Sequence, residues 1–183
     1  MRTLEQQLSN YASYHLDARN VATHFVGIPM IVLAVLALLS RPAAHWAGWT
    51  LTPAWPVALA AAVYYLRLDR PLGLLMCVLL GAALGFGAWA AAQATATWLA
   101  LGVGGFVVGW AVQFVGHAWE GRKPAFADDL MGLIVGPLFV AAEAVFLLGL
   151  RAELRRRVEA NAGALRAQAA DASPAHPAPH ARG

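Results

Sequence analysis

Apolar stretches separated by short polar segments predict a series of helices that run through a bilayer. Five such stretches are present, and they cover Phe25–Leu39, Pro53–Leu66, Leu72–Ala92, Thr95–Val115 and Met131–Leu150. A helix needs about 20 residues to cross the hydrocarbon core of a membrane. The third, fourth and fifth stretches are long enough, the first is long enough if it begins near Val21, and the second is short. The pattern therefore predicts an all-α, polytopic membrane bundle of four to five spans.

Amphipathic helices are predicted on both sides of this bundle. Ahead of the first span, Leu4, Leu8, Tyr11 and His15 recur at helical spacing, which indicates a helix lying on or against the membrane domain. After the last span, RAELRRRVEANAGALRAQ has the pattern of a basic amphipathic helix, and the stretch after it is rich in proline and alanine. We therefore expect a membrane-embedded domain at residues 1–157 and a basic, disordered tail at residues 158–183.

Positive charges in the loops predict which side of the membrane each end faces. The loops after the second and fourth stretches carry cations, namely Arg67, Arg70, Arg122 and Lys123, whereas residues 92–94 carry none. By the positive-inside rule those loops and the N-terminus are cytoplasmic. The arginines between residues 151 and 157 should be cytoplasmic as well, which five complete spans do not allow. We therefore expect an integral protein of a bacterial inner membrane in which the second or the fifth stretch crosses incompletely.

The residue pattern also predicts how individual helices pack and begin. The glycine- and alanine-rich motifs GAALGFG and LGVGG predict that the third and fourth stretches pack against each other, because small residues let membrane helices approach closely. Asn20 has the position and chemistry of an N-cap for the first span. Asp128 and Asp129 suit the start of the fifth span in the same way.

Composition supports a lipid environment and narrows the possible chemistry. The 183 residues are 60% hydrophobic and 13% charged, which is more apolar surface than a soluble domain of this length can bury. Cys77 is the only cysteine, so a disulfide framework and a cysteine-based zinc site are excluded within one chain. No phosphate loop, dinucleotide fingerprint, zinc-protease motif or serine nucleophile elbow is present. We expect no nucleic-acid partner, and the sequence does not define an oligomeric state.

Three histidines occupy the most informative positions. His15 ends the N-terminal helix, His24 opens the first span and His117 closes the fourth, so the predicted topology brings them to one face, on the cytoplasmic side. Imidazole is the commonest metal ligand among protein side chains. The three rings therefore suit a site for a single metal ion.

Charged residues near these histidines are candidates for the same site. Glu120 follows His117 by three residues and projects from the same helical face. Glu143 lies within an otherwise apolar span, where an ionisable group is costly and usually functional; the structural alternative is a glutamate that faces a neighbouring helix. Arg122 and Lys123 are typical of the positive charges at a membrane interface that set the orientation of the protein in the bilayer. They could also bind the carboxylate of a lipid substrate.

Two separated polar blocks resemble one known family. YASYHLDARNVATHFVGIP, beginning at Tyr11, and QFVGHAWEGRKPA, beginning at Gln113, are similar to the motifs of the membrane 2-hydroxy fatty acid dioxygenases. GPLFVAAEAVFLLG suits the final helix of that family, so the resemblance extends from about Leu4 to Arg151. One departure is Asp129, where the family pattern has asparagine.

The resemblance implies an Fe(II)-dependent dioxygenase that uses O₂ to shorten 2-hydroxy fatty acids by one carbon, in fatty acid α-oxidation at the membrane interface. It implies three metal ligands, His15, His24 and His117. The residues expected to act in catalysis, as further ligands or as hydrogen-bond partners, are Glu120, Glu143, Asn20 and Gln113. The residues expected to contact the substrate are Arg122, Lys123, Tyr11 and Tyr14. A 2-hydroxy acid would chelate iron through its hydroxyl and carboxylate groups and leave a coordination position for O₂.

Two other functions stay open on the sequence alone. A non-catalytic lipid-binding or scaffold protein would use the same polar cluster only to tie its helices together. A small-solute transporter would use the histidines as proton relays, although no inverted repeat is detectable in the chain.

Overall fold

The computed structural model describes residues 2–127 and 129–171, and these residues are almost wholly helical. Asp128 and the last part of the predicted tail, residues 172–183, lie outside the described residues. The two strands within the described ranges form a single hairpin. The prediction of an all-α fold is therefore confirmed.

Three helices are long and apolar enough to cross a membrane. They are α2 (Ala18–Ser40), α4 (Arg70–Ala91) and a continuous helix over Thr95–Glu120, which consists of α5 (Thr95–Leu99), a π-helical segment η1 (Ala100–Gly104) and α6 (Gly105–Glu120). Two further apolar helices are shorter, α3 (Ala54–Leu68) and α7 (Met131–Leu147). These two are the second and fifth predicted stretches, which the loop charges had singled out. Three long helices and two short ones are compatible with the predicted membrane bundle.

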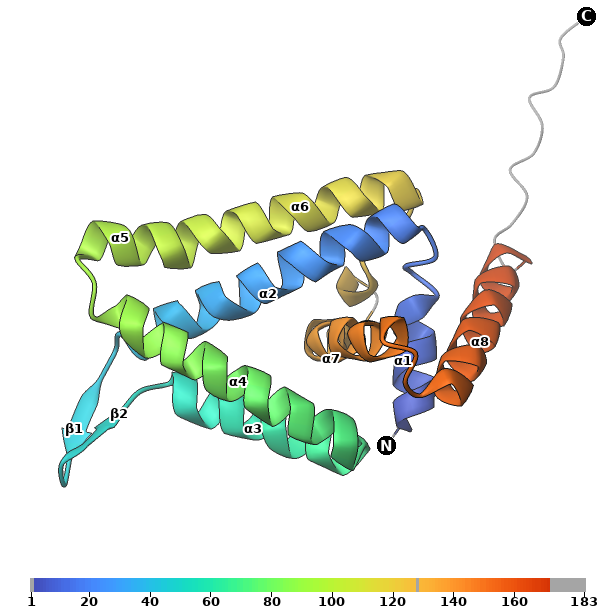
Figure 1. Cartoon of the computed structure of the whole chain (residues 1–183). Coiled ribbons are helices and arrows are strands. Elements are labelled where there is room, and N and C mark those ends of the chain that lie inside the picture. Colours follow the sequence, from blue (N-terminus) through green and yellow to red (C-terminus); the bar gives the residue numbers. More distant parts are fainter. Residues whose placement is uncertain (1, 128, 172–183) are drawn as a thin grey trace, which may run out of the picture.

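Helix α2 forms the centre of the bundle (Figure 1). It packs along α6 on one side and along α4 on the other, and α3 packs beside α4. Two helices, α1 (Leu4–Ala12) and α8 (Ala152–Asp171), lie side by side at one end of the bundle, where α2 begins and α6 ends. The hairpin of β1 (Ala44–Trp46) and β2 (Trp49–Leu51) projects from the opposite end. The two amphipathic helices therefore cover the end that holds the histidines.

The glycines of the two predicted motifs that meet a neighbour, Gly87, Gly102 and Gly105, pack on α2, so the prediction that the third and fourth stretches pack against each other is wrong. A Cβ atom added to Gly109 of α6 would lie 3.0 Å from the carbonyl oxygen of Gly27, and one added to Gly87 of α4 would lie 2.9 Å from that of Leu36. The missing side chains let the α2 backbone approach both neighbours. Because α2 lies between α4 and α6, these two helices are kept apart along most of their length.

Aspartates lie at the starts of α2 and α7, where the sequence predicted polar caps. The N-cap of α2 is Asp17, whose carboxylate accepts a hydrogen bond from Arg19 N at 2.8 Å. The expectation of Asn20 in this role is wrong, because the helix begins earlier and Asn20 is buried within its first turn. The N-cap of α7 is Leu130, but Asp129, one position before it, accepts a hydrogen bond from Met131 N at 2.9 Å and so binds the first turn from outside the cap position.

Asp69 joins two turns of the bundle. Its carboxylate caps α4 by accepting a hydrogen bond from Leu72 N at 3.0 Å, and it pairs at 2.8 Å with Arg151, which lies between α7 and α8. Partial burial favours the neutral carboxyl group, but the hydrogen bonds from Arg151 and Leu72 outweigh it and hold the pKa of Asp69 below its usual value. The pair therefore anchors the turn between α3 and α4 to the turn between α7 and α8.

Helix α8 packs on α1 through one apolar stripe. Leu154, Val158 and Ala162 are buried at intervals of four residues, and they join the same core as Leu4 and Leu8. The helix runs without a break past residue 157, where the sequence suggests that the membrane domain ends. Residues on both sides of that position contribute to the packing against α1.

The fourth stretch contains one π-helical segment, η1. A π turn holds one residue more than a regular α-helical turn. Contacts with α2 are made on both sides of it: before it, Trp98 donates its indole N–H to the Ala37 carbonyl at 2.9 Å, and after it Gly109 packs against Gly27. The extra residue thus lies between two parts of the helix that both face α2.

Candidate metal centre

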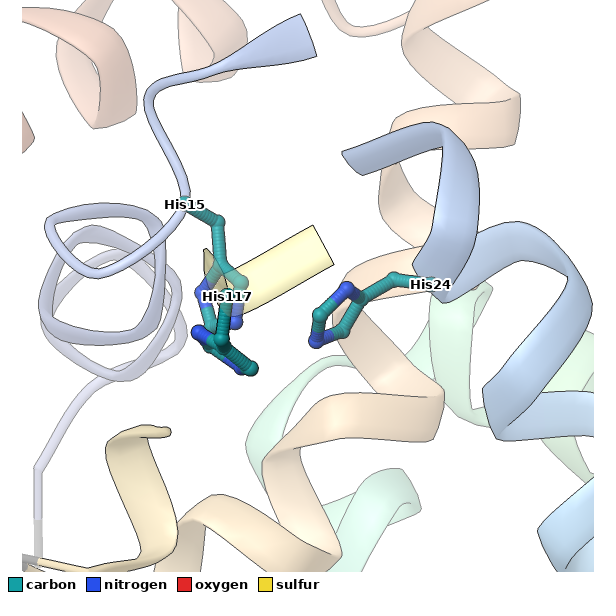
Figure 2. A group of neighbouring side chains, drawn as sticks. All are labelled: His15, His24 and His117. Carbon is teal, nitrogen blue, oxygen red and sulfur yellow. The ribbon is translucent and has the colours of Figure 1, made fainter. Parts of the chain in front are cut away.

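Three histidines from three segments meet at the end of the bundle covered by α1 and α8 (Figure 2). His15 lies in the turn between α1 and α2, His24 lies near the start of α2, and His117 lies in the last turn of α6. They are buried, with exposed fractions of 4%, 1% and 5%. The ring centroids lie 4.4 Å apart for His15 and His24, 5.0 Å for His15 and His117, and 5.1 Å for His24 and His117. The convergence predicted from the topology is confirmed.

Hydrogen bonds to backbone carbonyls orient two of the rings. His15 Nδ1 donates to the Tyr11 carbonyl at 2.7 Å, and His24 Nδ1 donates to the Asn20 carbonyl at 2.8 Å. A carbonyl oxygen only accepts, so in each ring Nδ1 carries the proton and Nε2 keeps its lone pair. Each histidine follows its carbonyl partner by four residues, so the local backbone alone sets both orientations.

Three further ring nitrogens of this cluster are buried and have no hydrogen-bond partner in the described part of the chain. They are Nε2 of His15, Nε2 of His24 and Nδ1 of His117. One ring nitrogen from each histidine lies within 4.8 Å of the others. Buried polar atoms are nearly always paired, and each unpaired one costs about 1–3 kcal/mol. Three unpaired imidazole nitrogens in one buried cluster fit a bound metal ion, and nitrogen donors of this kind suit zinc, copper, iron or nickel.

Burial and aromatic neighbours set the chemistry of His15. Its ring stacks on that of Tyr11 with centroids 4.3 Å apart, and the ring of Phe139 from α7 lies 5.9 Å away. Burial, reinforced by repulsion from His24, holds the pKa of His15 well below its usual value. The imidazole is therefore neutral at neutral pH, which is the form that binds metal ions.

Glu120 binds the turn between α1 and α2. Its carboxylate accepts hydrogen bonds from Asp17 N at 2.8 Å and from Asn20 Nδ2 at 3.2 Å, and it pairs with Arg166 of α8. Only 2% of its side chain is exposed. The group of mutually close ligand atoms found in the described ranges consists of the three histidines and does not include Glu120. Glu120 therefore ties the end of α6 to the turn that carries His15.

Asn20 and Gln113, which were also predicted to act in catalysis, lie close to the histidines. The side chain of Asn20 is fully buried, and its amide donates to Glu120 while its backbone carbonyl orients His24. Gln113 is buried one turn before His117 on α6. The structure thus brings both residues to the cluster.

Glu143 lies near α8. It is partly buried in α7, and the charged residues that act on its carboxyl group are Arg155 and Glu159. It follows Phe139, which contacts His15, by about one helical turn. The structure therefore places Glu143 beside α8 and outside the histidine cluster.

The residues predicted to contact a substrate surround the same end of the bundle. Arg122 donates to the Ser13 carbonyl at 3.1 Å, and its guanidinium lies 4.8 Å from the centre of the Tyr14 ring. Lys123 is exposed. Tyr11 is buried, and burial raises the pKa of its phenol group, so it stays protonated. Arg122 is thus held against the turn that precedes His15.

A small pocket connects His117 with the outer surface of the bundle. It measures about 60 Å³ and lies between α2, α6 and α7. Tyr11, Gln113 and His117 supply its polar groups. The remainder is mostly apolar and includes Ile31, Val32, Trp110, Leu133 and Pro137. Leu133 is 49% exposed, so the pocket reaches the surface between these helices.

Sequence reasoning missed two neighbours of the histidines, Arg166 and Phe139. Phe139 is 2% exposed and contacts the rings of both Tyr11 and His15. Arg166 follows the buried Ala162 by four residues, so the apolar stripe of α8 is the signal that would have indicated it. Phe139 has no comparable signal, because it is one apolar residue among many in α7.

Comparisons with known proteins identify relatives of the chain. The family model described as 2-hydroxy-palmitic acid dioxygenase Mpo1-like matches residues 1–148. The 2-hydroxy-palmitic acid dioxygenase MPO1 of Saccharomyces cerevisiae is 32% identical over 158 residues, which cover 85% of this chain and 87% of the yeast protein. No solved structure matches the chain. The family match extends over the five apolar helices and all three histidines, and it shows that the chain belongs to the Mpo1-like family.

Proposed function

We propose that this chain is an Fe(II)-dependent membrane dioxygenase that shortens 2-hydroxy fatty acids by one carbon. The observation that carries the proposal is the buried cluster of His15, His24 and His117, whose unpaired ring nitrogens suit a metal ion. The family to which the chain belongs, and the printed activity of the yeast relative, support the substrate class. The cationic loops support a site on the cytoplasmic face of a bacterial inner membrane.

The three histidines would hold the iron. When bound, ferrous iron would supply coordination positions for the 2-hydroxy acid and for O₂. The carbonyls of Tyr11 and Asn20 accept hydrogen bonds from the protonated Nδ1 atoms of His15 and His24. The Nε2 atoms of the two histidines therefore stay available as ligands. Tyr11 and Phe139 cover His15 with aromatic rings and exclude water from that side.

The pocket at His117 supports an acyl chain as the ligand. Tyr11, Gln113 and His117 give it polar groups, the other lining residues are mostly apolar, and one of these, Leu133, is exposed at the surface. A 2-hydroxy acid also combines a polar and an apolar part: its hydroxyl and carboxylate groups lie at one end, and the rest of the molecule is a chain of methylenes. We therefore expect the head group at the histidines and the first methylenes in the pocket. Arg122, Lys123 and Tyr14 would line the approach of the carboxylate.

The proposed reaction balances with O₂ as the only oxidant. R–CH(OH)–COOH and O₂ give R–COOH, CO₂ and H₂O. The bond between the carboxyl carbon and the hydroxyl-bearing carbon breaks, and that second carbon becomes the carboxyl group of the shorter acid. No further reductant is needed, because the substrate itself supplies all four electrons that reduce O₂.

Mass spectrometry of products tests the proposal. The purified protein, supplied with Fe(II), O₂ and a 2-hydroxy fatty acid, should release an acid one carbon shorter together with CO₂. His15→Ala, His24→Ala and His117→Ala should each abolish both activity and retained metal, whereas His45→Ala, in the exposed hairpin, should alter neither. Absence of bound iron and of product would support the scaffold alternative. Proton-coupled solute flux in liposomes without O₂ consumption would support the transporter.

A further inference from the structure

Helix α8 contributes a residue to the surroundings of the histidines although it lies beyond the segment that the family model matches. Its buried stripe of Leu154, Val158 and Ala162 continues at the same interval to Arg166. Residues four apart lie on one face of a helix. Because that face packs on α1, Arg166 lies where α1 ends and the chain turns toward His15.

The guanidinium of Arg166 binds two groups at this turn. Its Nη1 donates to the Glu120 carboxylate and, at 3.3 Å, to the Ser13 carbonyl. Arg122 donates to the same carbonyl at 3.1 Å. Arginines from two different segments therefore converge on a backbone group two residues before His15.

Glu120 depends on Arg166 for its charge compensation. Its side chain is 2% exposed, and its other donors, the backbone N–H groups of Asp17 and Leu16 and the Asn20 amide, are neutral. A buried carboxylate that loses its cationic partner is strongly destabilised, because neutral donors only partly replace the lost hydration. Removal of Arg166 would therefore weaken the hold of Glu120 on the turn.

Glu120 in turn supports all three histidines. It follows His117 within the last turn of α6, and it binds the backbone of Asp17 two residues after His15. It also binds the side chain of Asn20, whose carbonyl accepts the Nδ1 proton of His24. One carboxylate thus connects the three segments that carry the candidate ligands.

We propose that Arg166 is a positioning residue of the metal centre. Helix α8 acts as a latch: the Arg166–Glu120 pair fixes the turn that carries His15, and the affinity of the three histidines for a divalent metal depends on it. This inference rests on the metal centre of the proposed function and not on the identity of the substrate.

Titration of the full chain with Co(II) in detergent tests the latch, because Co(II) has visible absorption bands that report ligand number and geometry. Arg166→Ala should weaken Co(II) binding about tenfold or more, as the loss of groups that support metal ligands usually does, and should change the absorption bands. Arg166→Lys should recover part of the affinity, because it restores the charge. Arg156→Ala is the matched control, since Arg156 pairs with Glu153 on the exposed face of the same helix.

The outcomes separate this inference from the proposed function. Unchanged affinity and bands in Arg166→Ala, with normal Co(II) binding by the wild type, would overturn the latch alone. An equal loss in Arg156→Ala would also overturn it, because the effect would then come from α8 as a whole. Failure of the wild type to bind Co(II) would overturn the metal centre and the latch together. Where Arg166→Ala does not fold, Arg166→Gln keeps a donor for the Ser13 carbonyl without the charge, and the same weakening is expected.

Discussion

Glu120, at the end of α6, accepts a hydrogen bond from the backbone N–H of Asp17 at 2.8 Å, across 103 positions of sequence. The bond joins the helix that carries His117 to the turn that follows His15. The side chain of Glu120 is almost completely buried, so the bond is shielded from competing water. The carboxylate of Glu120 therefore helps to set the relative placement of the two histidines.

Replacing Glu120 by alanine should lower the free energy of unfolding by about 2–4 kcal/mol, because the Asp17 N–H and the Asn20 amide lose their buried acceptor. Glu120→Gln should cost less, since an amide oxygen in the place of Oε2 still accepts both of these bonds. Unfolding in detergent measures both changes. Glu159→Ala is the control, because Glu159 is exposed and pairs along α8 with Arg155. An equal effect in Glu120→Ala and Glu159→Ala would contradict the role given to Glu120.

Replacing Gly116 by alanine should displace α6 from α2. The added Cβ would lie 2.0 Å from Thr23 Oγ1 and 2.5 Å from Asn20 Oδ1. Overpacking of this kind costs about 1–3 kcal/mol, and the shift should move His117 away from His24, so metal affinity should fall together with stability. Gly85→Ala in α4 is the matched control, because nothing lies within 4 Å of its Cβ position. Normal metal binding by Gly116→Ala would show that the histidines tolerate the displacement.

The buried His15 should make the stability of the metal-free protein depend on pH. Its pKa in the folded protein is well below 6.5, the value expected for the unfolded chain. Below pH 6.5 the unfolded chain takes up a proton that the folded protein does not, so the free energy of unfolding falls with falling pH, by at most about 1.4 kcal/mol per pH unit. Above that pH this contribution is constant. Thermal unfolding of His15→Phe, which cannot titrate, should show a shallower slope below pH 6.5; an unchanged slope would refute the prediction.

Closing the pocket should lower activity toward the substrate without changing metal binding. Leu133→Trp places a larger side chain at the exposed part of the lining, so it should lower kcat/KM for long-chain 2-hydroxy acids about tenfold, which corresponds to about 1.4 kcal/mol. Metal content should stay at the wild-type level. Leu130→Trp is the control, because Leu130 is 74% exposed and does not line the pocket. Full activity in Leu133→Trp would indicate that the acyl chain lies elsewhere.

Much of the fold could be predicted because lipid imposes a simple pattern on the chain. The lengths of the apolar runs indicated the helices, whereas the incomplete crossing that the arginines near Arg151 suggest for the second or fifth run stays a prediction. Helix partners were harder to predict. The glycines of α4 and α6 show that these helices have close neighbours, but a glycine does not specify its partner, and the neighbour proved to be α2.

The histidine cluster was predictable because topology alone brings His15, His24 and His117 to one end. The direction of Glu120 was not, because its partners Asp17 and Arg166 are distant in sequence. Helical spacing placed Glu120 on the face of His117, but the hydrogen bonds that it makes are tertiary contacts. The spacing of Arg166 from Ala162 was visible, yet an arginine in a charged segment has the pattern of a solvated surface residue.

The π-helical segment of the fourth span holds one residue more than regular α-helical winding over the same length requires. Deleting one residue between Ala100 and Gly104 would therefore restore regular winding while the helix on either side keeps its rotational phase. Trp98 would still donate to the Ala37 carbonyl, and Gly109 would still pack against Gly27. This helix can thus lose one residue in the π-helical segment without turning either of its ends away from α2.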